Sequence, residues 1–127
     1  MRRIVLDIKG SLLRDAVGRT LTACDPDFIV FRSERPEETL SLCRSCHANV
    51  LVMEVARSGV WSLDERLKIG NGVKSLCRDC KTLLLVDEKQ DEMLAADVRQ
   101  AVKDKMVDNF IYASVSPTYL AGVIDTL

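Results

Sequence analysis

The sequence has a single histidine, almost no net charge and no long apolar run, and each shortage excludes a class of protein. Its 18 basic and 19 acidic residues are mixed along the chain, so its charge does not indicate binding to nucleic acid or to an anionic membrane. The opening MRRIVLDIKG reaches Asp7 and Lys9 too soon for a signal peptide or a membrane span. We therefore expect a cytoplasmic protein whose five cysteines stay reduced.

The single histidine lies in CRSCH, residues 43–47, which has the form of a c-type haem attachment site. Haem attachment of this kind normally follows export, for which the sequence shows no signal. His47 also leaves no second histidine to act as an axial ligand. Because so short a motif also arises by chance, we interpret it as part of a helix and expect no resident cofactor.

The distribution of apolar residues predicts an α/β fold. With 47% hydrophobic residues among 127, the chain is long enough for one domain with a sizeable core. Five short runs rich in Val, Ile, Leu and Phe have the near-continuous hydrophobicity of strands that are covered on both faces. These runs are residues 2–8, 27–31, 49–55, 82–86 and 109–115.

Segments with helical spacing alternate with these runs. They are expected to begin at Ser11, Pro36, Leu63, Asp91 and Ser116. Ser11 is the predicted N-cap of the first helix, and the third is expected to extend to Cys80 although Gly70-Asn71-Gly72 weakens its middle. Five strands alternating with five helices predict a parallel sheet with right-handed crossovers and helices on both faces.

In such an open sheet, ligands bind at the carboxyl ends of the strands. The residues that end the predicted strands are therefore the first candidates for a functional site. They are Asp7 with Lys9, Glu54, Val86 with Asp87, and Ala113 with Ser114.

The order of elements, with VLVMEV at 50–55 and NFIYASVSPTYL at 109–120, resembles the receiver domain of bacterial two-component response regulators. The family has segments such as LVLLDV and DYLTKPFSPEEL at these places. The resemblance covers essentially all 127 residues and implies a flavodoxin-like (βα)5 sandwich of three layers with strand order 2-1-3-4-5. We expect residues 1–127 to form one receiver-like domain. The short last helix ends at Leu127, which leaves open that an output domain follows in a longer regulator.

The residues on which phosphorylation depends in the family are mostly replaced. The resemblance places the phosphate-accepting aspartate at Glu54, the Ser or Thr after the fourth strand at Val86, and the lysine after the fifth at Ala113. The family's switch aromatic falls on Phe110. Phosphoryl transfer needs bound Mg²⁺ and a cation against the developing charge, whereas a methyl group stands in place of the lysine. We therefore predict a pseudo-receiver that is neither an enzyme nor phosphorylated in the usual way.

The family's acidic pair after the first strand is reduced to Asp7. Asp7, Glu54 and Asp87 are expected to form the remnant of an acidic pocket that binds Mg²⁺ weakly at most. Glu54 is one methylene longer than aspartate, so its oxygens reach toward the space of the phosphate and would imitate the phosphorylated state weakly. The alternative is that Glu54 only ends its strand and meets Lys9 or solvent.

The resemblance also implies a signalling role through protein partners in transcription regulation. We expect contacts with an output domain or a sensor kinase, and a homodimer formed through residues 91–127. Trp61, after the third strand, is expected either to contact a partner or to fold down over the sheet.

The cysteines offer an alternative function. Cys43 and Cys46 close the second predicted helix, and Cys77 and Cys80 close the third, at the sheet edge opposite the candidate site. If the pairs converge, they form a metal or redox sensor, with a four-cysteine zinc site as one possibility. Otherwise they pack in the core, because three of the four lie on apolar stripes of the helices.

Overall fold

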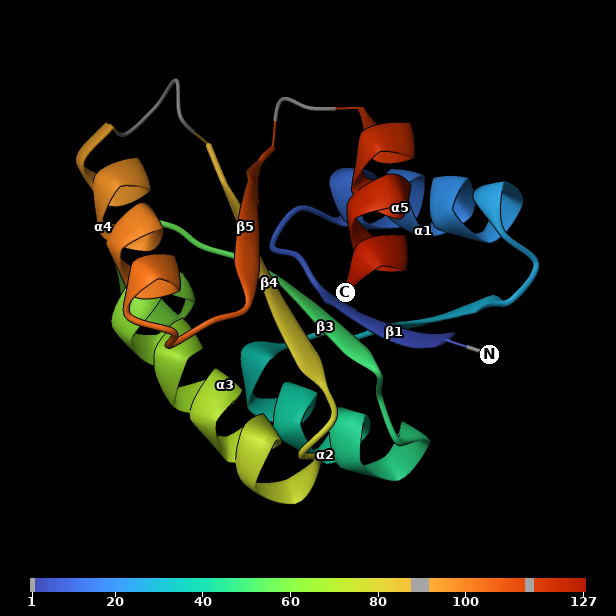
Figure 1. Ribbon diagram of the computed structural model, residues 1–127, viewed down its shortest axis with the longest axis horizontal. Helices are drawn as coiled ribbons and strands as arrows, with labels where there is room; N and C mark the ends of the chain where they lie inside the picture. The colour runs from blue at the N-terminus through green and yellow to red at the C-terminus, as the bar shows by residue number, and fades with distance from the viewer. Residues whose placement is uncertain (1, 88–91, 114–115) are drawn as a thin grey trace.

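A parallel five-stranded sheet forms the centre of the protein (Figure 1). The computed structural model describes residues 2–87, 92–113 and 116–127. The strand order is β2-β1-β3-β4-β5, which confirms the predicted flavodoxin-like topology. The strands are β1 (Arg2–Asp7), β2 (Phe28–Arg32), β3 (Val50–Glu54), β4 (Lys81–Val86) and β5 (Asn109–Tyr112).

Helices cover both faces of this sheet. α1 and α5 pack on one face, and α2, α3 and α4 pack on the other (Figure 1). No helix in the described part of the chain is long and apolar enough to cross a membrane. The helices are α1 (Ser11–Cys24), α2 (Pro36–Cys46), α3 (Leu63–Leu76), α4 (Glu92–Lys103) and α5 (Pro117–Thr126), with a 3₁₀ turn, η1 (Gly59–Trp61), before α3.

The alternation of side chains along β1 decides which residues enter which layer. Ile4 and Leu6 are buried in the core beneath α1 and α5, whereas Val5 is buried in the core beneath α2, α3 and α4. Since successive side chains of a strand point to opposite faces, Asp7 is directed to the same face as Val5. This phase places a carboxylate inside the layer formed by α2 and α3.

Several helix and strand boundaries in the structure differ from those predicted from the sequence. Gly10, not Ser11, is the N-cap of α1, and Ser11 is its first helical residue. α3 ends at Leu76, so that Cys77 is its C-cap and Cys80 lies beyond the helix, while the predicted weak point at 70–72 stays helical. β5 ends at Tyr112 rather than at residue 115. Two predicted positions, Asp91 and Ser114, lie outside the described residues.

The haem-like pentapeptide is the C-terminal turn of α2. His47 is its C-cap, with a left-handed backbone at φ 55° and ψ 57°, and it is exposed. The amide of Ala48 donates to the carbonyl oxygen of Cys43 at 3.0 Å, which closes the helix. The interpretation of CRSCH as part of a helix is therefore confirmed.

The carboxylate of Asp108, directly before β5, makes the stability of the fold depend on pH. Asp108 Oδ2 accepts hydrogen bonds from the Thr82 amide at 2.7 Å and from Lys74 Nζ at 2.8 Å. Burial by itself would raise the pKa of Asp108, but Lys74 and the Thr82 amide stabilise the charged form and hold the pKa below its ordinary value. A group with a lowered folded-state pKa stabilises the fold above its unfolded pKa, near 4, and this contribution is lost as pH falls through the folded value.

We predict that Asp108→Asn lowers the free energy of unfolding by about 1 kcal/mol at neutral pH, because the charge-assisted bond to Lys74 is lost. The difference from the parent should shrink as the pH falls below about 4. Urea unfolding at neutral and acidic pH measures both. Asp104→Asn, at the end of α4, is the matched control and should change little. An equal loss at both pH values would contradict the prediction.

Candidate functional site

The carboxyl edge of the sheet is hollowed beside β3 and β4. A cavity of about 720 Å³, here named the Glu54 cavity, opens where the strand order reverses. Two cations and two carboxylates contribute to its wall, so it has no excess of either charge. Its lining residues are Lys9, Gly10, Glu54, Val55, Ala56, Arg57, Asp87 and Leu94.

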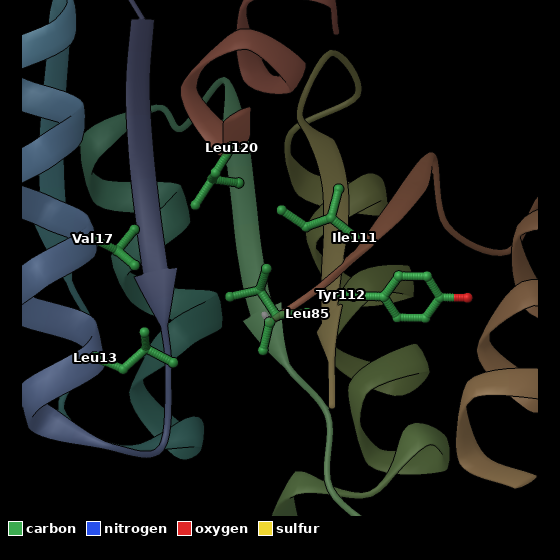
Figure 2. Close-up of a pocket in the computed structure, with 7 residues that line it drawn as sticks. Leu13, Val17, Leu85, Ile111, Tyr112 and Leu120 are labelled. Atoms are coloured by element: carbon green, nitrogen blue, oxygen red, sulfur yellow. The ribbon is translucent and has the colours of Figure 1, made fainter. Parts of the chain in front are cut away.

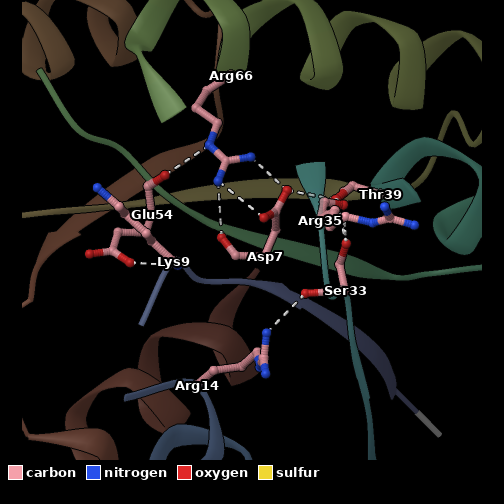
Figure 3. Close-up of polar contacts among 8 residues, drawn as sticks. All are labelled: Asp7, Lys9, Arg14, Ser33, Arg35, Thr39, Glu54 and Arg66. Atoms are coloured by element: carbon pink, nitrogen blue, oxygen red, sulfur yellow. Dashed lines mark hydrogen bonds and ion pairs between the residues drawn. The ribbon is translucent and has the colours of Figure 1, made fainter. Parts of the chain in front are cut away.

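Glu54 is the last residue of β3, and both its side-chain carboxylate and its backbone carbonyl accept hydrogen bonds. Its Oε1 accepts a hydrogen bond from the backbone N–H of Lys9 at 2.8 Å (Figure 3). Its carbonyl oxygen accepts one from Arg66 Nε, also at 2.8 Å. Of the two expectations for Glu54, the contact with Lys9 is the one observed, and it is made with the amide rather than with the ammonium. Glu54 therefore holds the loop that joins β1 to α1.

Asp7 does not belong to the Glu54 cavity. Its side chain is fully buried and lies in the fork of the Arg66 guanidinium, with Nη1 at 2.6 Å from Oδ2 and Nη2 at 3.1 Å from Oδ1 (Figure 3). The hydroxyl of Thr39 donates to the same Oδ2 at 2.6 Å. The expectation that Asp7, Glu54 and Asp87 share one pocket is therefore wrong, because the phase of β1 turns the Asp7 carboxylate into the α2 and α3 layer.

Arg66 is the centre of this arrangement. It stands in the first turns of α3, has no exposed surface, and donates to the Asp7 carboxylate, the Asp7 carbonyl and the Glu54 carbonyl. The ring of Trp61 lies over the guanidinium, with its centroid 4.4 Å from the central carbon. Trp61 is half-buried and thus folds down onto Arg66, and its contact with a partner stays a prediction. A buried guanidinium is stable only with such complete pairing.

The network continues from Asp7 into the start of α2. The Thr39 hydroxyl lies 2.7 Å from the Ser33 hydroxyl, which also bonds the carbonyl oxygen of Arg35 at 2.9 Å (Figure 3). Ser33 and Thr39 are themselves buried. The ion pair is thereby tied to four elements, β1, β3, α2 and α3. We name Asp7, Arg66, Thr39 and Ser33 the buried polar cluster.

Sequence reasoning missed Arg66, although a signal was present. Arg66 stands three residues after Leu63, four before Gly70 and seven before Val73, on the stripe that faces the sheet. A charge on an apolar stripe requires a buried partner of opposite sign. Asp7, at the end of a strand with no exposed face, is such a partner.

The other positions taken from the receiver pattern lie apart from the Glu54 carboxylate. Val86 is fully buried in the core beneath α4. The backbone N–H of Ala113 donates to the carbonyl oxygen of Val86 at 2.8 Å. Ala113 also lines a different, apolar cavity of about 80 Å³ between the sheet, α1 and α5 (Figure 2). Phe110 is half-buried and packs edge-on against Tyr112, with ring centroids 5.5 Å apart. Asp87, in contrast, lines the Glu54 cavity together with Glu54.

The cysteines converge at the opposite edge of the sheet without forming a metal centre. Cys43 and Cys80 are buried in the core, and Cys46 and Cys77 are half-buried against it. Within residues 2–87, 92–113 and 116–127, no group of three or more Cys, His, Asp or Glu side chains is arranged to hold a metal ion. This geometry does not support the four-cysteine zinc site, whereas the expected packing of cysteines in the core is confirmed.

We predict that Arg66→Met lowers the free energy of unfolding by about 3–5 kcal/mol, because the Asp7 carboxylate would remain buried without its partner. Asp7→Leu combined with Arg66→Met should recover much of this loss, since two apolar side chains replace two charges. Urea unfolding of the single and double variants measures the effect.

Lys68→Met is the matched control on the same helix, because its ion pair with Glu65 is exposed and should be worth less than about 1 kcal/mol. Arg66→Lys keeps the charge without the fork and should fall between parent and Arg66→Met. An Arg66→Met variant no less stable than Lys68→Met would contradict the prediction.

Comparison with known proteins identifies the fold. The chain superposes on a DNA-binding response regulator of the LuxR family from Staphylococcus aureus with a TM-score of 0.78 and 15% identity, over 99% of this chain and 98% of the other. The receiver domain of NarL from Mycobacterium tuberculosis gives a TM-score of 0.77 at 19% identity, over 98% and 94%. A third structure, described as a novel family of streptococcal redox sensors evolved from two-component response regulators, gives 0.78 at 16% identity, over 99% and 50%.

Sequence comparison adds no closer relationship. Neither a protein-family model nor a curated protein matches the sequence. The structural agreement extends over nearly the whole chain at low identity, and it confirms the fold that the sequence resemblance implied. The chain has the fold of response-regulator receiver domains.

Proposed function

We propose that this chain is a receiver-type signalling module that is not switched by phosphorylation at Glu54. The observation that supports this most directly is the ion pair of Asp7 with Arg66. The carboxylate that the receiver pattern requires after β1 is enclosed in the α2 and α3 layer and neutralised there. Since Mg²⁺ in phosphoryl-transfer sites is held by carboxylate oxygens, the Glu54 cavity lacks one of the expected ligands.

The groups that would stabilise a transferred phosphoryl group are also replaced. Val86 has no hydroxyl and is part of the core, and the methyl group of Ala113 lines the small apolar cavity. The cations at the Glu54 cavity, Lys9 and Arg57, come from loops after β1 and β3 instead of from the end of β5. Weak Mg²⁺ binding by Glu54 and Asp87 stays a prediction.

In this proposal Glu54 acts as a fixed structural anion. Its carboxylate bonds the Lys9 amide, so the loop before α1 is held without any ligand. A receiver whose loop is held in this way presents one surface constantly, and regulation then depends on which partner is present. This differs from a switch, in which a covalent modification selects between two conformations.

We further propose that the signal passes through protein contacts and not through catalysis. The partners would be an output domain or a sensor kinase in transcription regulation, a role for which the DNA-binding Staphylococcus aureus neighbour is a precedent. We also propose a homodimer through residues 91–127. Its support is that Met93, Met106 and Tyr119, all within that range, are large exposed apolar side chains.

Redox sensing is the second candidate. The observation in its favour is that the sulfurs of Cys46 and Cys77, from different CxxC motifs, both contact the carbonyl oxygen of Cys43. The streptococcal neighbour, which is described as a redox sensor, has the same fold at 16% identity.

We predict that Mg²⁺ with beryllofluoride, which imitates an acyl phosphate, changes neither Trp61 fluorescence, nor Tm, nor the sedimentation coefficient. Trp61 is the single tryptophan of the chain and stacks on Arg66, so its emission reports on the residues behind the Glu54 cavity. A Mg²⁺-dependent response that is lost in Glu54→Ala would overturn the proposal. Glu65→Ala, an exposed carboxylate on α3, is the control for this variant.

A restored variant tests the supporting observation itself. Glu54→Asp, Val86→Thr and Ala113→Lys together return three family residues but leave Asp7 paired with Arg66. We expect this triple variant to remain unresponsive to Mg²⁺ and beryllofluoride. A strong response would show that the Asp7–Arg66 pair is not what prevents phosphate chemistry.

A further inference from the structure

The C-terminal ends of α2 and α3 bring two thiols to a single atom. Cys46, the last residue of α2, has its sulfur 4.0 Å from the carbonyl oxygen of Cys43. Cys77, the C-cap of α3, has its sulfur 3.7 Å from the same oxygen. That oxygen is held in place by the Ala48 amide. The two sulfurs therefore both lie within 4.0 Å of one oxygen atom.

Each CxxC motif contains one thiol that the fold makes inert. Cys43 and Cys80 are fully enclosed in the core. Burial raises the pKa of the Cys80 thiol to about 12 and also raises those of Cys43 and Cys46, but only Cys43 and Cys80 also have almost no surface that an oxidant can reach. Oxidation within either motif would require one of these two. The half-buried thiols, Cys46 and Cys77, belong to different motifs, and both contact the Cys43 carbonyl oxygen.

We propose that Cys46 and Cys77 form a reversible disulfide that joins α2 to α3 when the protein meets a low-molecular-weight disulfide. The pair crosses between the two CxxC motifs instead of lying within one. The proposal deepens the redox-sensing candidate, and it is independent of whether the Glu54 cavity binds a phosphate analogue. Closure requires rotation of the two side chains past the Cys43 carbonyl oxygen, because the sulfurs must come within bonding distance.

The reaction is two successive thiol–disulfide exchanges. The thiolate of one cysteine attacks a sulfur of the small disulfide, forms a mixed disulfide and releases one small thiolate. The thiolate of the other cysteine then attacks the protein sulfur of the mixed disulfide, forms the Cys46–Cys77 bond and releases the second small thiolate. The protein loses two electrons and two protons: the small disulfide accepts the electrons as its S–S bond breaks, and the two released thiolates accept the protons and become thiols.

The cross-link acts on the helices that hold the buried polar cluster. Thr39 on α2 and Arg66 on α3 both bond Asp7 near the N-terminal ends of these helices. Cys46 and Cys77 stand at the opposite ends of the same helices. A disulfide between these ends closes a loop that the unfolded chain must keep and so lowers the entropy of the unfolded state, which means that the oxidised protein should unfold at a higher temperature than the reduced one.

The test uses the full chain with Cys24→Ser, which removes the exposed cysteine, and glutathione disulfide as oxidant. We expect intact mass to fall by two hydrogens, a peptide map to join Cys46 to Cys77, Tm to rise, and dithiothreitol to reverse all three. Adding Cys46→Ser or Cys77→Ser should leave a protein that only gains the mass of one glutathione. Reduced Tm values of these variants, close to that of the parent, show that they are folded.

Three results would overturn the proposal. They are a disulfide within Cys43–Cys46 or Cys77–Cys80, a parent that stops at mixed disulfides, and a cross-link that leaves Tm unchanged. Adding Cys80→Ser to the Cys24→Ser chain is a further check, because closure of the Cys46–Cys77 pair should persist without it. None of these readouts depends on Mg²⁺ or beryllofluoride, so the two proposals fail separately.

Discussion

The fully buried ion pair between Asp7 and Arg66 is the interaction on which the rest of the site depends. Moving two charges out of water costs several kcal/mol for each, and their attraction offsets this only when the remaining donors and acceptors are satisfied. The surrounding residues meet that condition. Thr39 donates to the carboxylate, the carbonyl oxygen of Glu54 accepts a hydrogen bond from Arg66 Nε, and the Trp61 ring covers the guanidinium.

These requirements explain the position of several elements at once. Arg66 reaches Asp7 because η1 and the first turns of α3 pass over the ends of β1 and β3. The Ser62 hydroxyl accepts a hydrogen bond from the Glu65 amide and so sets where α3 begins. Because the guanidinium donates its hydrogen bond to the backbone carbonyl of Glu54, the Glu54 side chain is left to line the cavity and to accept from the Lys9 amide. The buried Arg66 guanidinium thus holds both the carboxylate of Asp7 and the backbone carbonyl of Glu54.

The sequence allowed the architecture to be predicted, because each strand has the continuous hydrophobicity of a segment covered on both faces. The helix ends were less certain, as Gly10 and Leu76 show, because local hydrogen bonds decide them. For the site, the sequence predicted the location at the carboxyl edge of the sheet but not the direction of its side chains. Whether Asp7 points to the edge or into a layer depends on the phase of β1, and a shift of one residue reverses it. Arg66, on α3, becomes informative only when it is considered together with that phase.

The same helix pair joins the two edges of the sheet. On α2, Thr39 and Cys46 are about 10 Å apart along the axis, and on α3, Arg66 and Cys77 are about 16 Å apart, at 1.5 Å per residue. Because α2 and α3 pack against each other, the proposed disulfide would constrain one end of the same helix pair whose other end holds Asp7. The buried polar cluster fixes that other end, because its hydrogen bonds are short and a displaced donor would leave a charge without a partner. The proposed disulfide and the Asp7–Arg66 pair would thus constrain the same two helices from opposite ends, without any contribution from phosphate.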